Sequence, residues 1–155
     1  MKMMFALITN ALCFVSTSVL SAGVSSDSGQ NIFHCEATTL PLDDGHSLVL
    51  WKGKGITVAT ANKPDHMSTI ECAGTIENMA DKSFKAAGYC LHTDHDGDKW
   101  IDRWWNDSSM KKGRFEATGL SGKWKDVSNL KGEFVFTDLS TTSECKGVST
   151  WQTTD

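Results

Sequence analysis

Short runs in which hydrophobic and polar residues alternate, separated by turn residues, dominate the chain from Phe33 onward. A period of two is typical of β-strands with one buried face, and long stretches with a helical period are missing. We expect extended segments at 33–42, 47–60, 68–78, 88–93, 99–105, two or three within 113–139, and one at 144–154. The pattern predicts an all-β fold, a closed antiparallel barrel of about eight strands, with a sandwich as the alternative.

Two segments leave the number of elements open. Residues 47–60 could form two short strands or one strand bent at Gly53 and Gly55. Residues 79–87 fit either a helical turn or a polar connection. The segment 94–98, DHDGD, is more definite, because Asp-Gly between two strands is a strong hairpin signal and glycine accepts a positive φ. We therefore predict a hairpin with its tip at Asp94 to Asp98.

Alternation in KWIDRWW places Trp100, Asp102 and Trp104 on one face of the strand that follows this hairpin. An acid between two tryptophans is unusual on a face that points to solvent. If this face points into the barrel, Asp102 is neutral or needs a partner, such as Arg114 or a ligand hydroxyl. The alternative is a structural aspartate bonded to neighbouring backbone or arginine groups.

Aromatic residues elsewhere in the chain suggest a lined cavity, since six tryptophans are many for one domain of this size. An eight-stranded barrel has room for its own side chains or for one small ligand. The sequence therefore predicts a cavity that binds a small apolar or aromatic molecule. Phe134 and Phe136 are further candidates for its inner wall. The predicted ligand contacts are Trp51, Trp100, Asp102, Trp104 and Trp124. The alternative is a structural or interaction domain whose barrel is filled by its own side chains.

The N-terminus resembles a secretory signal peptide at 1–22, with Lys2, an apolar middle and small residues at its end. We expect a flexible lead-in at 23–33 and a single barrel domain at 34–155. Export implies a secreted or periplasmic protein without a membrane anchor after cleavage. Cys35, Cys72, Cys90 and Cys145 remain in the exported chain and predict two disulfides, with three pairings open.

The charge pattern gives no reason to expect a nucleic-acid partner. The net charge is −4, and the basic residues are interrupted by acids rather than gathered in a stripe. The predicted partner is a small hydrophobic molecule.

The acidic hairpin partly matches a metal-binding loop. Counted from Asp94, the acids Asp96 and Asp98 fall at positions 3 and 5 of a calcium loop of the EF-hand kind. However, Lys99 and Trp105 occupy the positions that need Gly and Glu. Calcium binding by the three aspartates is an alternative to an ordinary turn, and we expect no metal.

Zinc and cofactors are not expected either. His92 and His95 are three residues apart, so an extended strand points them to opposite faces. Motifs for serine hydrolases, zinc hydrolases and phosphate-binding loops are missing. The enzymatic alternative is a cofactor-free cyclase or isomerase in which Asp102 or Glu116 acts as acid or base.

Three motifs together resemble a known family. They are the strand GYCLHT with its DGDK hairpin ending in RWW, the turn GLSGKW before GEFVFT, and the final strand GVSTWQTT. In this order they resemble small secreted bacterial proteins with an allene-oxide-cyclase-like or dirigent-like barrel of the calycin group. The resemblance spans 70–154 and implies an eight-stranded barrel with a hydrophobic cavity and no metal cofactor. Relatives bind apolar molecules or guide cyclisation and coupling of reactive intermediates.

The resemblance also implies a disulfide pairing. In such a barrel the strands that carry Cys72 and Cys90 are near neighbours, so these two residues would be bridged. Barrel closure would bring Cys35 on the first strand to Cys145 on a late strand.

Overall fold

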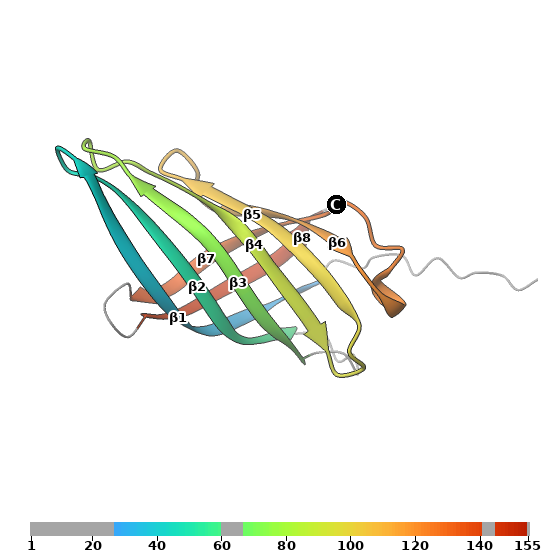
Figure 1. The fold of residues 1–155 in the computed structure, drawn as a ribbon. Coiled ribbons are helices and arrows are strands. Elements are labelled where there is room, and N and C mark those ends of the chain that lie inside the picture. Colours follow the sequence, from blue (N-terminus) through green and yellow to red (C-terminus); the bar gives the residue numbers. More distant parts are fainter. Residues whose placement is uncertain (1–26, 60–66, 141–144, 155) are drawn as a thin grey trace, which may run out of the picture.

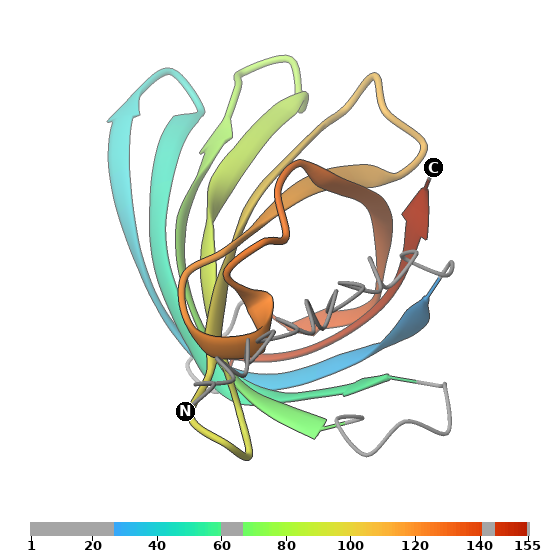
Figure 2. The same cartoon turned by 90° about the vertical axis from the view of Figure 1, so that its right-hand side faces the viewer.

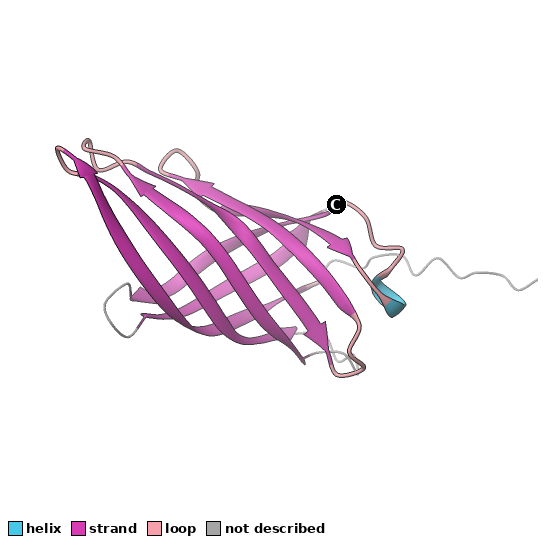
Figure 3. Ribbon diagram, in the orientation of Figure 1, coloured by secondary structure: helices cyan, strands magenta, loops and turns pink. Residues whose placement is uncertain are grey.

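Eight strands follow one another around a closed antiparallel barrel (Figure 1). The structure, a computed structural model, describes residues 27–59, 67–140 and 145–154. Strands make up almost all of its secondary structure (Figure 3). The strands are β1 (Ser28–Asp43), β2 (His46–Ala59), β3 (Met67–Asn78), β4 (Phe84–Asp94), β5 (Lys99–Asp107), β6 (Gly113–Gly119), β7 (Leu130–Ser140) and β8 (Cys145–Thr154). The predicted all-β barrel is confirmed.

The two segments that the sequence left open form one strand and one turn. Residues 46–59 form the single strand β2, which includes Gly53 and Gly55. The connection before β4 is a turn rather than a helix, closed by a hydrogen bond from the Met79 backbone N–H to the Ser83 carbonyl at 2.8 Å. Between β6 and β7 lies only a short 3₁₀ helix, η1 (Gly122–Trp124).

The predicted lead-in at 23–33 is wrong for its second half. Strand β1 begins at Ser28, which is paired with β8, and residues 29–33 are paired with both β2 and β8. Their polar composition suggested a floppy segment, but the backbone of this stretch supplies the hydrogen bonds that close the barrel. The predicted signal peptide at 1–22 lies outside the described residues.

The seam between the first and last strands runs from the pair Ser28 and Gln152 to the pair Cys35 and Cys145. A disulfide joins the two cysteines at the end of this seam. The second disulfide joins Cys72 on β3 to Cys90 directly opposite on β4. The implied pairing is therefore confirmed, and two disulfides are consistent with an oxidising compartment.

Aromatic rings lie over glycines of neighbouring strands inside the barrel. Phe33 covers Gly147, and Trp104 packs on both Gly74 and Gly88. A Cβ atom at any of these glycines would overlap the ring. The missing side chains thus give room for rings that fill part of the interior, as in the buried cluster of Ile70, Cys72, Cys90, Trp104, Phe115 and Phe134.

One opening of the barrel is partly crossed by the connection from β6 to β7, which carries η1 (Figure 2). The β4–β5 hairpin lies at the same end, and three backbone and side-chain hydrogen bonds link Lys99 to Leu120 and Ser121. Among the described residues, no helix has the length and apolarity needed to cross a membrane.

The two disulfides should differ in their effect on stability. Cys35 and Cys145 are 110 residues apart, whereas Cys72 and Cys90 are 18 apart. Because the longer loop restricts the unfolded chain more, C35S/C145S should lower the free energy of unfolding by about 4–5 kcal/mol and C72S/C90S by about 3 kcal/mol. Urea unfolding of both double variants at the same pH measures the difference. A larger loss for C72S/C90S would contradict this ranking.

Candidate functional site

A cavity of about 400 Å³ lies in the barrel interior at the end crossed by η1. It brings together all five side chains predicted to contact a ligand: Trp51, Trp100, Asp102, Trp104 and Trp124. Phe134 and Phe136, the further candidates for the inner wall, also line it. The barrel is therefore not completely filled by its own side chains, contrary to the structural-domain alternative.

Strand β5 supplies three of these residues, and its alternation is as predicted. Trp100, Asp102 and Trp104 line the cavity, whereas Lys99 and Arg103 are exposed on the outer face. The hairpin at 94–98 sets this register by placing Trp100 opposite His92 and Asp102 opposite Cys90. The inner face of β5 thus meets the inner face of β4.

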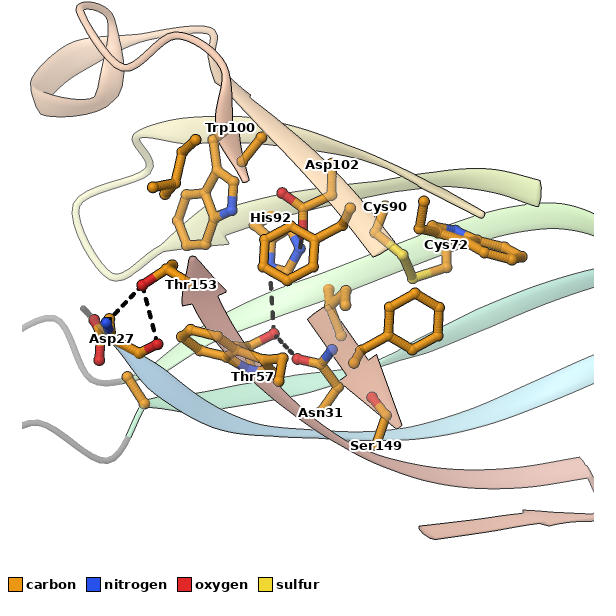
Figure 4. Close-up of a pocket in the computed structure, with 18 of the residues that line it drawn as sticks. Asp27, Asn31, Thr57, Cys72, Cys90, His92, Trp100, Asp102, Ser149 and Thr153 are labelled. Atoms are coloured by element: carbon orange, nitrogen blue, oxygen red, sulfur yellow. Dashed lines mark hydrogen bonds and ion pairs between the residues drawn. A yellow bond between two sulfur atoms is a disulfide. The ribbon is translucent and has the colours of Figure 1, made fainter. Parts of the chain in front are cut away.

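A buried histidine pairs with the half-buried aspartate. His92 Nε2 lies 2.9 Å from Asp102 Oδ2, and both side chains line the cavity (Figure 4). The other ring nitrogen, Nδ1, lies 3.2 Å from Thr57 Oγ1, and that hydroxyl donates to Asn31 Oδ1 at 2.8 Å. His92 is 2% exposed. Four residues from four strands therefore form one polar chain in a mostly apolar wall.

The hydrogen-bond chain fixes where protons can be. A hydroxyl has one hydrogen, and Thr57 donates it to Asn31, so Thr57 can only accept from His92. His92 Nδ1 therefore carries a hydrogen. The contact between Nε2 and Asp102 Oδ2 then holds one further proton, on the imidazole or on the carboxyl group. The pair is neutral overall in both arrangements.

Aromatic stacking connects this pair to the end of the barrel. The ring of Trp100 stacks on His92 with centroids 4.6 Å apart and planes at 9°. Trp124 of η1 packs on Trp100 at 4.5 Å. The Trp124 indole N–H donates to Asp94 Oδ2 at 2.7 Å. The acidic hairpin thus positions the tryptophans that cover the histidine.

Four buried polar atoms in the cavity-lining side chains lack a hydrogen-bond partner within the described ranges. They are the indole nitrogens of Trp51, Trp104 and Trp151, and Asp102 Oδ1. An unsatisfied buried polar group costs about 1–3 kcal/mol. The wall therefore contains unused donors and one unused acceptor.

The acidic hairpin is a turn that holds the neighbouring connection. Gly97 has the predicted positive φ, of 85°. Asp94 Oδ1 accepts the backbone N–H groups of Asp96 at 2.9 Å and of Asp98 at 3.0 Å. Asp94 Oδ2 also lies 3.0 Å from Lys123 Nζ. Burial raises the pKa of the Asp94 carboxyl, but hydrogen bonds from Trp124, Lys123, Asp98 and Asp96 outweigh it and leave the pKa below its ordinary value.

These contacts bear on the calcium alternative at Asp94, Asp96 and Asp98. The ammonium group of Lys123 lies 3.0 Å from Asp94 and 3.1 Å from Asp96. Asp98 Oδ2 accepts the Lys123 backbone N–H at 3.0 Å. Protein donors thus contact all three carboxylates. The ligand atoms of Asp94, His95 and Asp96 lie within 4.8 Å of one another, whereas Asp98 is not part of this group, so calcium binding by the three aspartates stays a prediction. His95 is exposed at the hairpin, away from the buried His92, so the two do not face each other.

Two residues considered for the site lie elsewhere. Glu116 sits between Phe115 and Ala117, which line the cavity, so alternation places the Glu116 side chain on the outer face of β6. Arg114 is exposed on the same face. The prediction that Glu116 acts as acid or base in the cavity is therefore wrong, and the partner of Asp102 is His92 rather than Arg114.

His92 was missed by the sequence analysis as a cavity residue, although a signal was present. The predicted hairpin tip already implies that His92 lies diagonally across from Asp102, within reach of a long side chain. Thr57 and Asn31 gave no such signal, because they come from distant strands that only barrel closure brings to His92. Trp151 also lines the cavity and was not singled out.

Comparisons with known proteins show the fold alone. No protein-family model matches the chain, and no curated protein matches it. Among solved structures, an enzyme from Penicillium herquei is similar, with a TM-score of 0.61 and 16% sequence identity over 82% of this chain and 90% of that chain. This likeness supports the barrel architecture, while the resemblance to allene-oxide-cyclase-like proteins stays a prediction.

Asp94 should be far more important for stability than its neighbour Asp96. Asp94→Asn removes the charged acceptor for Trp124 and Lys123 and should lower the free energy of unfolding by about 1.5–3 kcal/mol at pH 7. Asp96→Asn, the matched control, removes only exposed contacts, with the same lysine and with His95, and should cost below about 1 kcal/mol. Urea unfolding measures both losses, and equal losses would contradict the assigned role.

The Asp94 effect should also depend on pH. Because its pKa is lowered in the folded protein, the stabilisation is complete above the unfolded pKa of about 3.9 and is lost as pH falls through the folded pKa. The difference between wild type and Asp94→Asn should therefore shrink below about pH 4. A difference that is constant from pH 7 to pH 3 would argue against a charged Asp94 as the anchor.

Proposed function

We propose that this barrel binds a small, flat, apolar or aromatic molecule in its interior cavity. The observation that carries the proposal is the cavity of about 400 Å³ with five predicted side chains in its wall. Small-molecule pockets typically have volumes of about 300–1,000 Å³ and mostly apolar walls with a few polar groups. The tryptophans supply contact area, and the His92–Asp102 pair supplies the polar end.

The unused polar atoms define the ligand more closely. A ligand oxygen can accept from an indole N–H, and a ligand hydroxyl can donate to Asp102 Oδ1. An aromatic molecule with a carbonyl or hydroxyl group is therefore a better match than a pure hydrocarbon. We propose Trp51, Trp100, Trp104 and Trp124 as ligand contacts and Asp102 as the orienting group.

The chain is further proposed to be an exported protein of the calycin type, similar to allene-oxide-cyclase-like barrels. The signal-like residues 1–22 and the two disulfides support export. The proposed partner is a small hydrophobic molecule, with no nucleic acid, no metal and no cofactor required.

Titration calorimetry with 1-naphthol and naphthalene tests the binding function. 1-Naphthol should bind about 3–10-fold more tightly, because its hydroxyl gains one hydrogen bond worth about 0.5–1.5 kcal/mol. Trp100→Leu should weaken 1-naphthol binding about tenfold by removing an aromatic contact of about 1.4 kcal/mol.

The matched control is Trp105→Leu, the adjacent tryptophan on the same strand, which does not line the cavity. Its affinity for 1-naphthol should equal that of the wild type. If neither compound binds, or if the two tryptophan variants lose the same affinity for 1-naphthol, the cavity is not the binding site.

A further inference from the structure

The carboxylate of Asp102 is held at one oxygen only. Oδ2 contacts His92 Nε2 at 2.9 Å, while Oδ1 is buried and has no partner among the residues the structure describes. The Asp102 side chain lines the cavity and is 17% exposed. A structural aspartate would be expected to use both oxygens, as Asp94 does at the hairpin.

The arrangement behind Asp102 keeps the imidazole in one orientation. Thr57 and Asn31 fix the hydrogen on His92 Nδ1, and Trp100 stacks on the ring. His92 can therefore exchange only its Nε2 proton, and only with Asp102. When that proton is on the imidazole, Asp102 is a carboxylate in the cavity wall whose Oδ1 is covered by neighbouring atoms and has no partner among the described residues. A carboxylate with one unpaired oxygen is the state required of a general base.

We propose that Asp102 moves a proton on the bound molecule, with His92 as its positioning residue. The inference rests on the proposed binding function and deepens it. The substrate class is an apolar or aromatic molecule with a C–H bond next to a carbonyl group. The reaction class is tautomerisation or double-bond migration without a cofactor.

The step balances within the cavity. Asp102 Oδ1 takes the proton from the carbon, the C–H electron pair becomes a C=C bond, and the carbonyl oxygen takes the negative charge. The same Oδ1–H then returns a proton to that carbon or to a conjugated one. The site stays neutral overall, because the imidazolium and the carboxylic acid together offset the enolate. A neutral site limits the cost of forming charge away from water.

Two other charged residues line the cavity, Asp27 and Lys123. Lys123 contacts Asp94 and Asp96 at the hairpin. The backbone N–H of Asp27 bonds to Thr153 Oγ1 at 2.7 Å. A pH dependence of the reaction could also arise from either of these two groups. Lys123→Gln and Asp27→Asn each remove one of them and show whether the pH dependence comes from it.

Hydrogen exchange into 2-tetralone, an enolisable bicyclic ketone, tests the proposal without a known natural substrate. The oxidised protein is incubated with 2-tetralone in D₂O, and loss of the proton signal of the carbon between ring and carbonyl is followed by NMR. The wild type should accelerate exchange about 10²-fold or more over an equal concentration of acetate, within the range of general-base catalysis. 1-Naphthol, which competes for the cavity, should suppress the acceleration in the unmodified protein.

Variants separate the roles. Asp102→Asn should reduce the exchange rate to that of the buffer. The calorimetric Kd for 2-tetralone should change less than about threefold, because the variant loses stabilisation of the transition state and not of the bound ground state. His92→Gln should slow exchange and change its pH profile, which a merely structural role would not do. Glu116→Gln, on the outer face of β6, is the control and should match the wild type.

Each outcome decides between the two proposals. Binding of 2-tetralone without faster exchange, or exchange that survives in Asp102→Asn, overturns the proton transfer and leaves the binding function standing. An exchange that 1-naphthol does not suppress places the reaction outside the cavity and also overturns it. Failure of both compounds to bind overturns the binding function and the proton transfer together.

Discussion

Closure of the sheet by β1 and β8 is the constraint on which the other features depend. Once the seam from Ser28 to Cys35 is paired with β8, alternate residues along the part of each strand that surrounds the interior point into a confined space. Aromatic rings over glycines fill part of that space, and the remainder is the cavity. The disulfide between Cys35 and Cys145 links the two strands of the seam covalently.

A single line of contacts runs from the surface hairpin to the polar pair inside. Asp94 holds Trp124, Trp124 packs on Trp100, Trp100 stacks on His92, and His92 bonds to Asp102. The crowded aspartates of DHDGD thus have a structural explanation in which no ion is required. Their role is to place the connection that carries Trp124 over one end of the cavity.

Fold and function are separate conclusions for this barrel. Closed barrels support many activities, so the likeness to one solved enzyme at 16% identity supports the architecture alone. The cavity wall supports the proposed function, because tryptophans surround a histidine and an aspartate with one oxygen that has no partner among the described residues. These groups would serve binding and proton transfer in the same place.

Local pattern alone was enough for much of this structure. Alternation identified the inner face of β5 with Trp100, Asp102 and Trp104, and Asp-Gly located the hairpin, because both signals act between residues close in the chain. Only the tertiary structure showed that His92 is the partner of Asp102 and that Thr57 and Asn31 extend this hydrogen-bond chain. It also showed that Glu116 lies on the outer face of the barrel. Those contacts depend on barrel curvature and closure, which bring together strands that are far apart in sequence. The hydrophobic period of a single segment cannot predict contacts between strands that are far apart in the sequence.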